Sequence, residues 1–409
     1  MTRVKWGLRR GSRLLQMLNE IPKPCTSRSG GPCPSTCTDN EAIFGMANIL
    51  IFVSKTGGGH ISLGEALRDL LIDKHRIELI DPQPRIVHWH YRTVSRHALW
   101  LWALEYRLSN GPRRARLAHT LAQALAPLII RAIEQFKPDL VMTTYPFLAD
   151  EVTAAMKLRP RVRRPFAMLL SDPGPVHSAW LTERGADAVF APTRETFQQA
   201  LAAKLPPERL HLTGWPVRGQ FYHGGPERAE ILERMGLNPD RFTVFMQGGG
   251  EGATGYAAAV EQLSNIEGLQ IILAVGTNHA LYERFRGHKS VFALPFTKEI
   301  ARPMSAADVV MGKAGPNILF ESVTLGKPFI ATSYIPGQEK PNLDFIRRYG
   351  LGWVALEKLG QRALLESLIH QPEQLQAARE SVQHYRDWNT RAVRQIPGLV
   401  DGLLFAGEW

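Results

Sequence analysis

Short apolar runs alternate with helical patterns along most of this chain, and no other feature limits its fold so strongly. The runs form two series, separated by a stretch rich in glycine and proline. They occupy residues 47–53, 76–80, 139–144, 166–170, 188–191 and 210–213 in the first series, and 243–247, 270–275, 290–294, 309–312 and 328–332 in the second. Strands that are buried on both faces and joined by helices have this pattern. It predicts an α/β protein with two Rossmann-like domains that face each other across a cleft.

The length of the chain also favours two domains. A chain of 409 residues, 44% of them apolar, exceeds what one hydrophobic core usually supports. Because Met46 directly precedes the first strand, we expect the segment before it to be a disordered extension or an artefact of the start-codon assignment. The expected parts are an extension over 1–45, a first domain over 46–217, a hinge over 218–226, a second domain over 227–372, and C-terminal helices over 373–409 that cross back to the first domain. Ligands of open parallel sheets bind at the carboxyl ends of the strands, so the active site is expected in the cleft.

A glycine loop follows the first strand of each series. In the first series, Gly57-Gly58-Gly59 leads into His60 and a helical pattern. Glycines let a substrate approach the backbone, and the start of a helix favours a neutral imidazole that can accept a proton. The alternative interpretation is a tight turn between strand and helix with an incidental histidine.

The glycine loop of the second series is Gly248-Gly249-Gly250. Backbone amides between a strand and a helix, aligned with the helix dipole, suit a diphosphate. The loop lacks the lysine and hydroxyl of a Walker motif, which disfavours an ATP-hydrolysing site.

A third constellation lies near the end of the second series. Glu321 falls on a helical pattern that follows Lys313, and the loop one strand later carries Gln338 and Glu339. Carboxylates and amides bind the hydroxyl groups of a ribose and a hexose, because both sugars are arrays of donors and acceptors. The alternative is a helix with a solvated glutamate and a polar turn.

Residues 46 to about 356 resemble the monogalactosyldiacylglycerol synthases and the processive diacylglycerol glucosyltransferases, relatives of the lipid II N-acetylglucosaminyltransferase with the two-domain GT-B fold. Five motifs in the family's order carry this resemblance. They are Thr56-Gly57-Gly58-Gly59-His60, Ser171-Asp172-Pro173-Gly174-Pro175-Val176-His177-Ser178-Ala179-Trp180, Gly214-Trp215-Pro216-Val217-Arg218, Lys313-Ala314-Gly315-Pro316 and Tyr334-Ile335-Pro336-Gly337-Gln338-Glu339. The chain departs from the family at Pro316-Asn317-Ile318, where small residues such as Gly-Thr are usual, and at Ile61, where a basic or polar residue is common.

The resemblance implies a UDP-hexose donor and a lipid acceptor, most simply diacylglycerol, and no cofactor or metal beyond them. His60 is implied as the general base and Asp172 as a second catalytic candidate, and the acceptor side includes Gly58, Gly59 and His177. The residues implied on the donor are Gly248, Gly249 and Gly250 on the diphosphate, Phe296 on the uracil, Glu321 on the ribose, Gln338 and Glu339 on the sugar, and Lys313, Gly315 and Asn342 nearby.

The chemistry that fits these residues is a single in-line displacement. His60 takes the proton of the acceptor hydroxyl while that oxygen attacks the anomeric carbon, and UDP leaves with inversion. Backbone amides of the Gly248 loop, helix N-termini and Lys313 stabilise the charge on the leaving group. The chain contains no Asp-x-Asp motif of the kind that binds a metal in other glycosyltransferases.

The basic excess of the chain is concentrated near the expected acceptor side. Residues 85–135 hold eight arginines against two acidic residues, interleaved with aromatic side chains. The residues expected to meet a membrane are Trp89, Trp100, Trp102, Arg113 and Arg114. Arginines with tryptophans at helical spacing are typical of an interfacial helix on an anionic membrane surface. The alternatives are an ordinary helical pair with core tryptophans, or a nucleic-acid partner, which the absence of a known nucleic-acid motif disfavours.

The remaining features bear on location and on competing functions. Cys25, Cys33 and Cys37 all precede the first strand, and the chain shows no signal peptide or long apolar run. We therefore expect a cytoplasmic protein that is peripherally associated with the inner face of the cell membrane. Two alternatives to a transferase are a UDP-sugar 2-epimerase and an inactive protein that binds lipid or nucleotide. The sequence does not distinguish galactose from glucose or another hexose.

Overall fold

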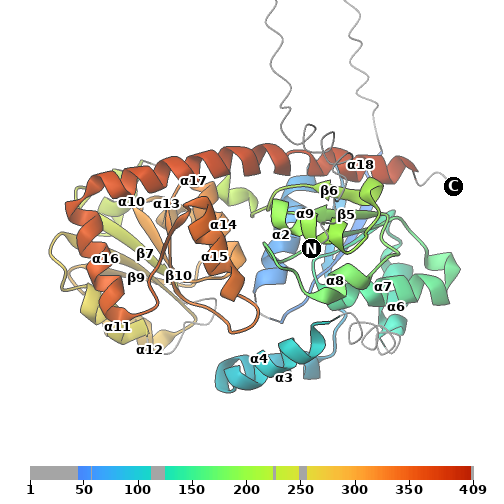
Figure 1. Cartoon of the computed structure of the whole chain (residues 1–409), viewed down its shortest axis with the longest axis horizontal. Helices are drawn as coiled ribbons and strands as arrows, with labels where there is room; N and C mark the ends of the chain where they lie inside the picture. Colours follow the sequence, from blue (N-terminus) through green and yellow to red (C-terminus); the bar gives the residue numbers. More distant parts are fainter. Residues whose placement is uncertain (1–44, 57, 112–124, 224–226, 248–255, 407–409) are drawn as a thin grey trace, which may run out of the picture. The chain divides into compact units, whose positions relative to one another are not determined.

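The computed structural model describes residues 45–56, 58–111, 125–223, 227–247 and 256–406. The chain divides into two compact units, Met1–Gly45 and Met46–Trp409. The expected extension therefore lies almost entirely outside the described residues. Every helix and strand below belongs to the second unit (Figure 1).

The first sheet has six parallel strands in the order β2-β1-β3-β4-β5-β6. Its strands are β1 (Asn48–Phe52), β2 (Arg76–Ile80), β3 (Leu140–Thr143), β4 (Phe166–Leu169), β5 (Ala188–Ala191) and β6 (Leu210–Leu212). Residues 49–52 of β1 are fully buried, because helices cover both faces of the sheet. The sheet order changes direction at β1, which pairs with β2 on one side and β3 on the other.

The second sheet is also parallel and has the order β12-β11-β10-β7-β8-β9. Its strands are β7 (Phe242–Gln247), β8 (Leu269–Gly276), β9 (Val291–Pro295), β10 (Val309–Lys313), β11 (Phe329–Ser333) and β12 (Gly352–Val354). The predicted α/β class with two parallel sheets is confirmed, and β12 is a strand that the sequence analysis missed. The order changes direction at β7, so the carboxyl ends of β1 and β7 lie where ligands of such sheets usually bind.

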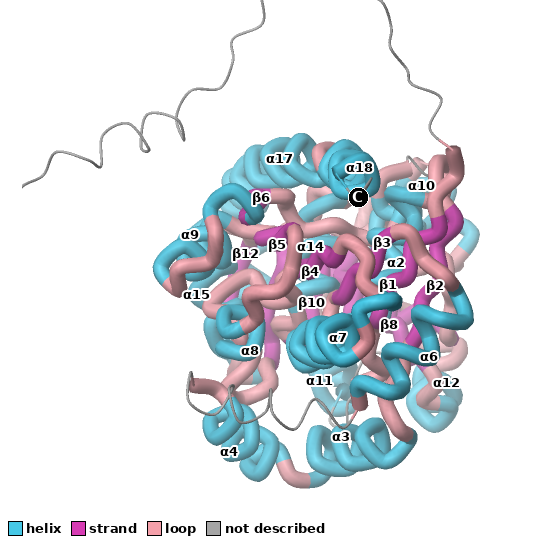
Figure 2. Tube along the Cα trace, turned by 90° about the vertical axis from the view of Figure 1, so that its right-hand side faces the viewer, coloured by secondary structure: helices cyan, strands magenta, loops and turns pink. Residues whose placement is uncertain are grey.

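Helices connect the strands and cover the sheets. Those of the first half are α2 (Gly59–Leu71), α3 (Arg85–His97), α4 (Leu99–Ser109), α6 (Ala126–Phe136), α7 (Pro146–Leu158), α8 (Ser178–Thr182) and α9 (Arg194–Ala202). Those of the second half are α10 (Arg228–Arg234), α11 (Tyr256–Leu263), α12 (His279–Phe285), α13 (Ala301–Ser305), α14 (Pro316–Thr324), α15 (Lys340–Tyr349) and α16 (Lys358–His370). The chain then continues into α17 (Pro372–Val393) and α18 (Ile396–Ala406), which lie away from α3 and α4 in both views (Figures 1 and 2).

The segment that leaves the first sheet is anchored on both halves of the unit. Trp215 is fully buried and stacks on Phe320 of α14, with ring centroids 4.7 Å apart and planes 4° from parallel. Asn389 of α17 accepts a hydrogen bond from the Trp215 amide (2.7 Å) and donates one to the Trp215 carbonyl (2.9 Å). Gly214 has a φ of +70°, and a Cβ there would lie 2.8 Å from the Asn389 carbonyl oxygen, so this position requires glycine.

The C-terminal helix also fastens the first half. Asp401 of α18 lies 3.0 Å from His75 and 3.3 Å from Lys74, both just after α2. Together with the contacts of α17 on α14, this makes the two C-terminal helices a strap across both sheets. Among the helices that the structure describes, none has the length and apolar content needed to cross a membrane.

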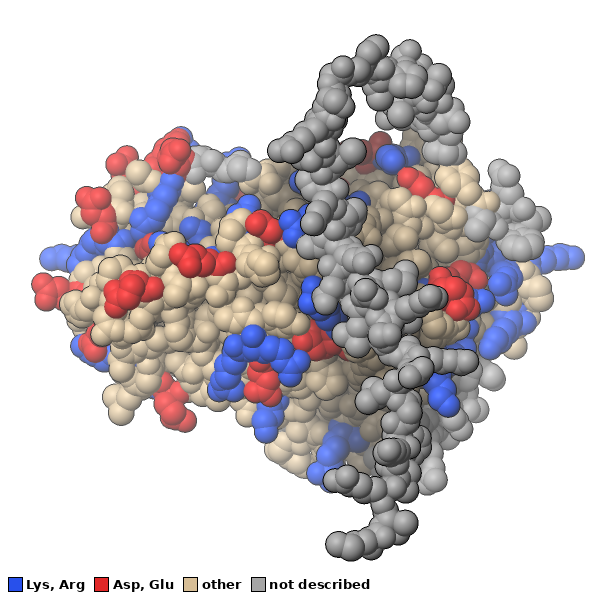
Figure 3. Space-filling view, turned by 45° about the horizontal axis from the view of Figure 1, so that its top comes forward, with Lys and Arg blue, Asp and Glu red and all other residues tan. Residues whose placement is uncertain are grey.

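Charged side chains are mixed on the face that includes the C-terminal helices. Figure 3 shows basic and acidic groups interspersed there, with no field of a single sign. The part of this face that is visible therefore shows no gathering of basic groups.

Replacing Asn389 by alanine should destabilise the protein, because the amide and the carbonyl of Trp215 would both lose their partner in a buried position. Each such loss costs about 1–3 kcal/mol, so the free energy of unfolding should fall by about 2–4 kcal/mol. Urea denaturation measures this change. Gln383→Ala, which truncates an exposed carboxamide on the same helix, is the matched control and should leave the midpoint nearly unchanged. Equal effects of the two substitutions would contradict the role assigned to Asn389.

Candidate active site

The candidate site lies at the carboxyl ends of the two sheets, where α2 and α14 begin. The loop after β1 leads directly into α2 and His60, and the loop after β10 leads into α14. The two helices contact each other. The fold thus brings His60, which follows the first glycine loop, close to the helix that carries Glu321.

His60 is held in one defined tautomer. Its Nδ1 lies 2.8 Å from the carbonyl oxygen of Thr144. A carbonyl only accepts, so Nδ1 carries the proton and Nε2 keeps its lone pair. Burial lowers the pKa of His60 to about 4, although the hydrogen bond to Thr144 opposes this effect. The imidazole is therefore neutral at pH 7 and has a free proton acceptor.

The surroundings of the imidazole fix its orientation. Thr144 Oγ1 donates to the His60 carbonyl (3.0 Å), and the Tyr145 ring meets the imidazole edge-on at 4.7 Å. The Tyr145 hydroxyl hydrogen-bonds with Thr56 and Gln83, and burial raises its pKa to about 12. These supporting residues come from three different loops, and only Thr56 among them stands in a motif that was recognised in the sequence.

Asp172 lies in the loop after β4 and reaches the second half of the chain. Burial raises its pKa, and the charge of Glu339 adds to the rise, which brings the pKa to about 7. Hydrogen bonds from the His177 amide and the Gln338 side chain oppose this shift. The structure thus joins the predicted acceptor loop to the predicted sugar loop, and Asp172 titrates in the neutral range.

His177 lies beside Asp172, but both of its ring nitrogens are engaged. Nδ1 accepts a hydrogen bond from the Ala179 amide (3.2 Å), so Nε2 carries the proton and donates to Ser109 Oγ at the end of α4 (3.2 Å). Burial lowers the pKa of His177 to about 4. In this structure the side chain caps α8 and holds α4 against the acceptor loop.

Glu321 is buried in α14 and pairs with Arg218, which follows the anchored Trp215. The Nε and Nη2 atoms of Arg218 donate to Glu321 Oε1 at 3.2 and 2.8 Å. Burial raises the pKa of Glu321, and the guanidinium opposes the rise. The sequence analysis included Arg218 in a motif but did not foresee this ion pair.

Lys313, Gly315, Glu339 and Asn342 come together around the turn before α14. Glu339 is buried, forms an ion pair with Lys313, and accepts from the Ile335 amide (2.7 Å). Asn342 donates to the Ala314 carbonyl (2.8 Å) and so fixes the turn.

Other predicted donor and membrane residues are less enclosed or lie outside the described ranges. Phe296 follows β9 and is 62% exposed. The predicted diphosphate loop, Gly248 to Gly250, falls in a range that the structure does not describe, as do Arg113 and Arg114. Across the described ranges, no group of three or more His, Cys, Asp or Glu side chains is placed to hold a metal ion.

The N-termini of α2 and α14 lie side by side, and neither has a side-chain cap. Asn317 Nδ2 of α14 donates to the Gly59 carbonyl of α2 at 2.7 Å, which joins the two ends directly. Uncapped amides at the positive ends of two helices form a favourable place for an anion such as a diphosphate.

The three predicted membrane tryptophans lie on α3 and α4 and differ in their exposure to solvent. Trp89 and Trp100 are 60% and 72% exposed. Trp102 is half-buried and packs edge-on against Tyr91 at 5.1 Å. Trp102 therefore supports the helix pair through its partly buried ring, and contact of the three tryptophans with a membrane stays a prediction.

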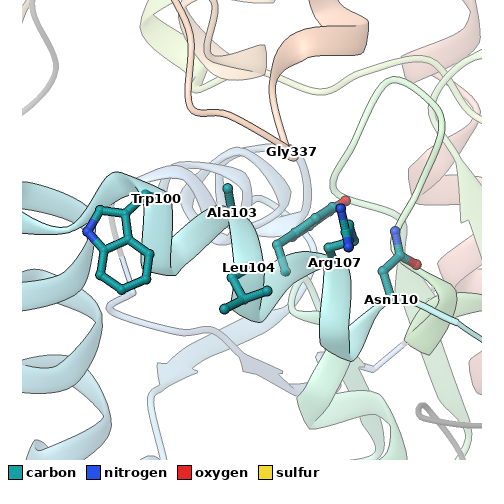
Figure 4. A pocket seen from close by; sticks show the side chains of 7 residues that line it. Trp100, Ala103, Leu104, Arg107, Asn110 and Gly337 are labelled. Carbon is teal, nitrogen blue, oxygen red and sulfur yellow. The ribbon is translucent and has the colours of Figure 1, made fainter.

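A groove of about 660 Å³ lies along α4 beside the loop of Gly337 (Figure 4). It is lined by Trp100, Ala103, Leu104, Tyr106, Arg107, Asn110 and Gly337. A Cβ on Gly337 would lie 3.2 Å from Tyr106 Cδ1, and its φ is +87°, so glycine permits this close approach. The first half thus contacts the loop of the second half through α4.

Known proteins match this chain over both halves. The family model for monogalactosyldiacylglycerol (MGDG) synthase matches residues 72–217, and that for the glycosyltransferase family 28 C-terminal domain matches residues 243–379. A probable monogalactosyldiacylglycerol synthase 2, chloroplastic, of Oryza sativa subsp. japonica is 27% identical over 349 residues, which cover 79% of this chain and 73% of the relative. Monogalactosyldiacylglycerol synthase 3, chloroplastic, of Arabidopsis thaliana is 27% identical over 335 residues, with coverages of 75% and 71%.

Solved structures share the fold at low sequence identity. The calicheamicin glycosyltransferase superposes with a TM-score of 0.57 and 15% identity, covering 88% of this chain and 98% of that one. A UDP-GlcNAc 2-epimerase from Neisseria meningitidis has a TM-score of 0.53 and 13% identity, covering 88% and 100%. The predicted GT-B architecture is confirmed, and because the epimerase shares it, the fold does not by itself distinguish transfer from epimerisation.

Replacing Asp172 by asparagine should change the pH dependence of stability. The folded-state pKa of about 7 lies above the ordinary value of 3.8. Ionisation therefore destabilises the folded state, and the loss develops as the pH rises from about 4 to 7. The unfolding temperature of Asp172→Asn, relative to that of the unmodified protein, should increase over this range. Asp344→Asn, which removes an exposed carboxylate outside the site, is the control for the loss of a carboxylate as such. A constant difference for Asp172→Asn would contradict the raised pKa.

Proposed function

We propose that this chain, which belongs to the monogalactosyldiacylglycerol synthase family of GT-B glycosyltransferases, transfers a hexose from a UDP-sugar to a lipid hydroxyl, most simply that of diacylglycerol. The observation that carries the proposal is the neutral imidazole of His60, with Nε2 free, beside two uncapped helix N-termini. A base next to an anion site is what transfer from a nucleoside diphosphate sugar requires.

In the proposed reaction, His60 Nε2 takes the proton of the acceptor hydroxyl. The oxygen forms a bond to the anomeric carbon while the bond from that carbon to the diphosphate oxygen breaks, and the configuration inverts. The hydrogen bond from Nδ1 to Thr144 keeps the ring oriented while Nε2 accepts the proton. The carbonyl of Thr144 also stabilises the imidazolium that forms, because it accepts from the charged ring.

The negative charge of the departing UDP is stabilised by the starts of α2 and α14. Both ends offer amide donors, since neither has a side-chain cap. Lys313 lies at the same turn, where its pair with Glu339 sets its position. The predicted contacts of Glu321 with the ribose, Phe296 with the uracil, and Gln338 with the sugar belong to this proposal. Asp172 supports the last of these, because it hydrogen-bonds Gln338.

The proposed acceptor enters from a membrane surface along α4. Trp89 and Trp100 expose large apolar surfaces, and Leu104 and Arg107 line the groove that leads to Gly337. An indole at the acyl boundary with arginine at the headgroups is a common arrangement for reversible binding to an anionic membrane. We propose a peripheral association with the inner, cytoplasmic face of a cell membrane. The named plant relatives are chloroplast proteins, so the choice of membrane is part of the test.

Replacing His60 by alanine should abolish most transfer. Wild-type protein incubated with UDP-galactose or UDP-glucose and diacylglycerol should give glycolipid and UDP, identified by mass spectrometry. His60→Ala should lower kcat by about 100- to 10,000-fold, because a general base contributes that much, while UDP affinity is retained. Full turnover by His60→Ala would remove His60 as the base.

The same assay distinguishes the competing functions. Conversion of the free UDP-sugar to its 2-epimer, without a lipid product, would support an epimerase. UDP or lipid binding without any product would support an inactive binding protein. In the transferase, protonation of His60 should lower kcat/KM only as the pH falls towards 4, and a change near pH 7 would report the titration of Asp172.

The combined substitution of Trp100 by alanine and Leu104 by serine should weaken binding to vesicles that contain anionic lipid. Loss of two exposed apolar side chains should lower the partition coefficient by about tenfold or more. Co-sedimentation with vesicles at low and high salt measures this, and salt should release the unmodified protein. Leu359→Ser is the control, because Leu359 is a highly exposed leucine on α16 of the second half. Unchanged partition after the double substitution would refute the membrane role of α4.

A further inference from the structure

Asn317 connects the two halves of the chain at the candidate site. It is the second residue of α14, and its Nδ2 donates to the carbonyl oxygen of Gly59, 2.7 Å away. Gly59 is the first residue of α2 and directly precedes His60. The bond therefore ties the start of the proposed donor helix to the backbone of the proposed base.

A separate set of bonds ties the same helices further from the site. Asp69 of α2 accepts from the Gly219 amide (2.8 Å), and the adjacent Arg218 pairs with Glu321 of α14 (2.8 Å). These bonds pass through the segment that connects the two halves. Asp69 lies ten residues beyond Gly59 in α2, a distance of about 15 Å along the helix. A rotation of the halves about the connecting segment therefore displaces the Asn317 contact more than it displaces these bonds.

The Asn317 contact is suited to opening and closing. Asn317 is half-buried and Gly59 is exposed, so water can replace either partner when the bond breaks. The Gly59 carbonyl oxygen has two lone pairs, so it can accept a hydrogen bond from Asn317 and another from within α2.

We propose that Asn317 is a positioning residue that latches the N-termini of α2 and α14 together. With the latch closed, the amides of both helices face one anion site while His60 is held beside it. With the latch open, the donor can still bind the second half, but the base is no longer aligned with the anomeric carbon. This inference rests on the proposed transferase function. Within that function, Asn317 keeps the base His60 aligned with the anomeric carbon.

The test compares Asn317→Ala with Asn317→Gln and with the control Asn265→Ala. Asn265 is an exposed asparagine whose side chain donates a hydrogen bond to the nearby Glu261 carbonyl, one turn away on the same segment. Asn317→Ala should lower kcat by about tenfold, the effect of one lost hydrogen bond, with little change in the KM for UDP-hexose. Asn317→Gln, which retains the donor, should recover part of the loss. Neither should change the unfolding temperature more than Asn265→Ala does.

A second readout does not depend on turnover. Hydrogen exchange followed by mass spectrometry should show faster exchange of the amides at the start of α2 in Asn317→Ala than in the unmodified protein or the control. The UDP affinity of Asn317→Ala, measured by calorimetry, should be unchanged.

Each other outcome has a defined meaning. Unchanged kcat together with unchanged exchange would overturn the latch. A fall in UDP affinity at unchanged kcat would also overturn it, because Asn317 would then be a donor ligand. If the unmodified protein makes no glycolipid at all, the proposed function fails, and the exchange data still decide whether Asn317 holds the two helices together.

Discussion

The stack of Trp215 on Phe320 positions the candidate site, because it fixes the connecting segment against α14 at the point where the chain leaves the first sheet. Both side chains are fully buried, and the Trp215 backbone is satisfied by Asn389 from the C-terminal strap. Three residues further on, Arg218 is therefore at the right place to pair with Glu321. Through these contacts α14 lies beside α2, and the carboxyl ends of the two sheets meet at the starts of the same two helices.

Burial shifts the histidine and the aspartate of the site in opposite directions. It lowers the pKa of His60 to about 4 and raises that of Asp172 to about 7. Near neutral pH the histidine carries no charge, and Asp172 is only partly ionised. The charge of Lys313 is paired with Glu339, and that of Arg218 with Glu321. The N-termini of α2 and α14, which have no side-chain cap, add positive potential to these pairs. This balance is compatible with the proposed diphosphate leaving group and the proposed uncharged acceptor.

The sequence was sufficient to predict features that local pattern determines, and insufficient for those that long-range packing determines. The strands of both sheets follow from apolar runs, although the short β12, in which Trp353 is only half-buried, has too weak a pattern to detect. The position of His60 at a helix start follows from the glycines before it. Its tautomer does not, because the Thr144 carbonyl that sets it is 84 residues away in the chain. The Asn317 contact spans 258 residues, so the sequence showed only an unusual residue there.

The helix α4 links the outer surface of the protein to both sides of the site. Its Tyr106 meets the His177 ring at 5.3 Å, and the same side chain lies against Gly337, next to the Gln338 that bonds Asp172. Trp100 and Leu104 extend from the exposed side of this one helix. Any molecule that displaces α4 therefore acts on the acceptor loop and on the sugar loop together. An acceptor that binds along α4 with its apolar part and enters the site with its hydroxyl satisfies both contacts at once, and an amphiphile is the class of molecule with that shape and polarity.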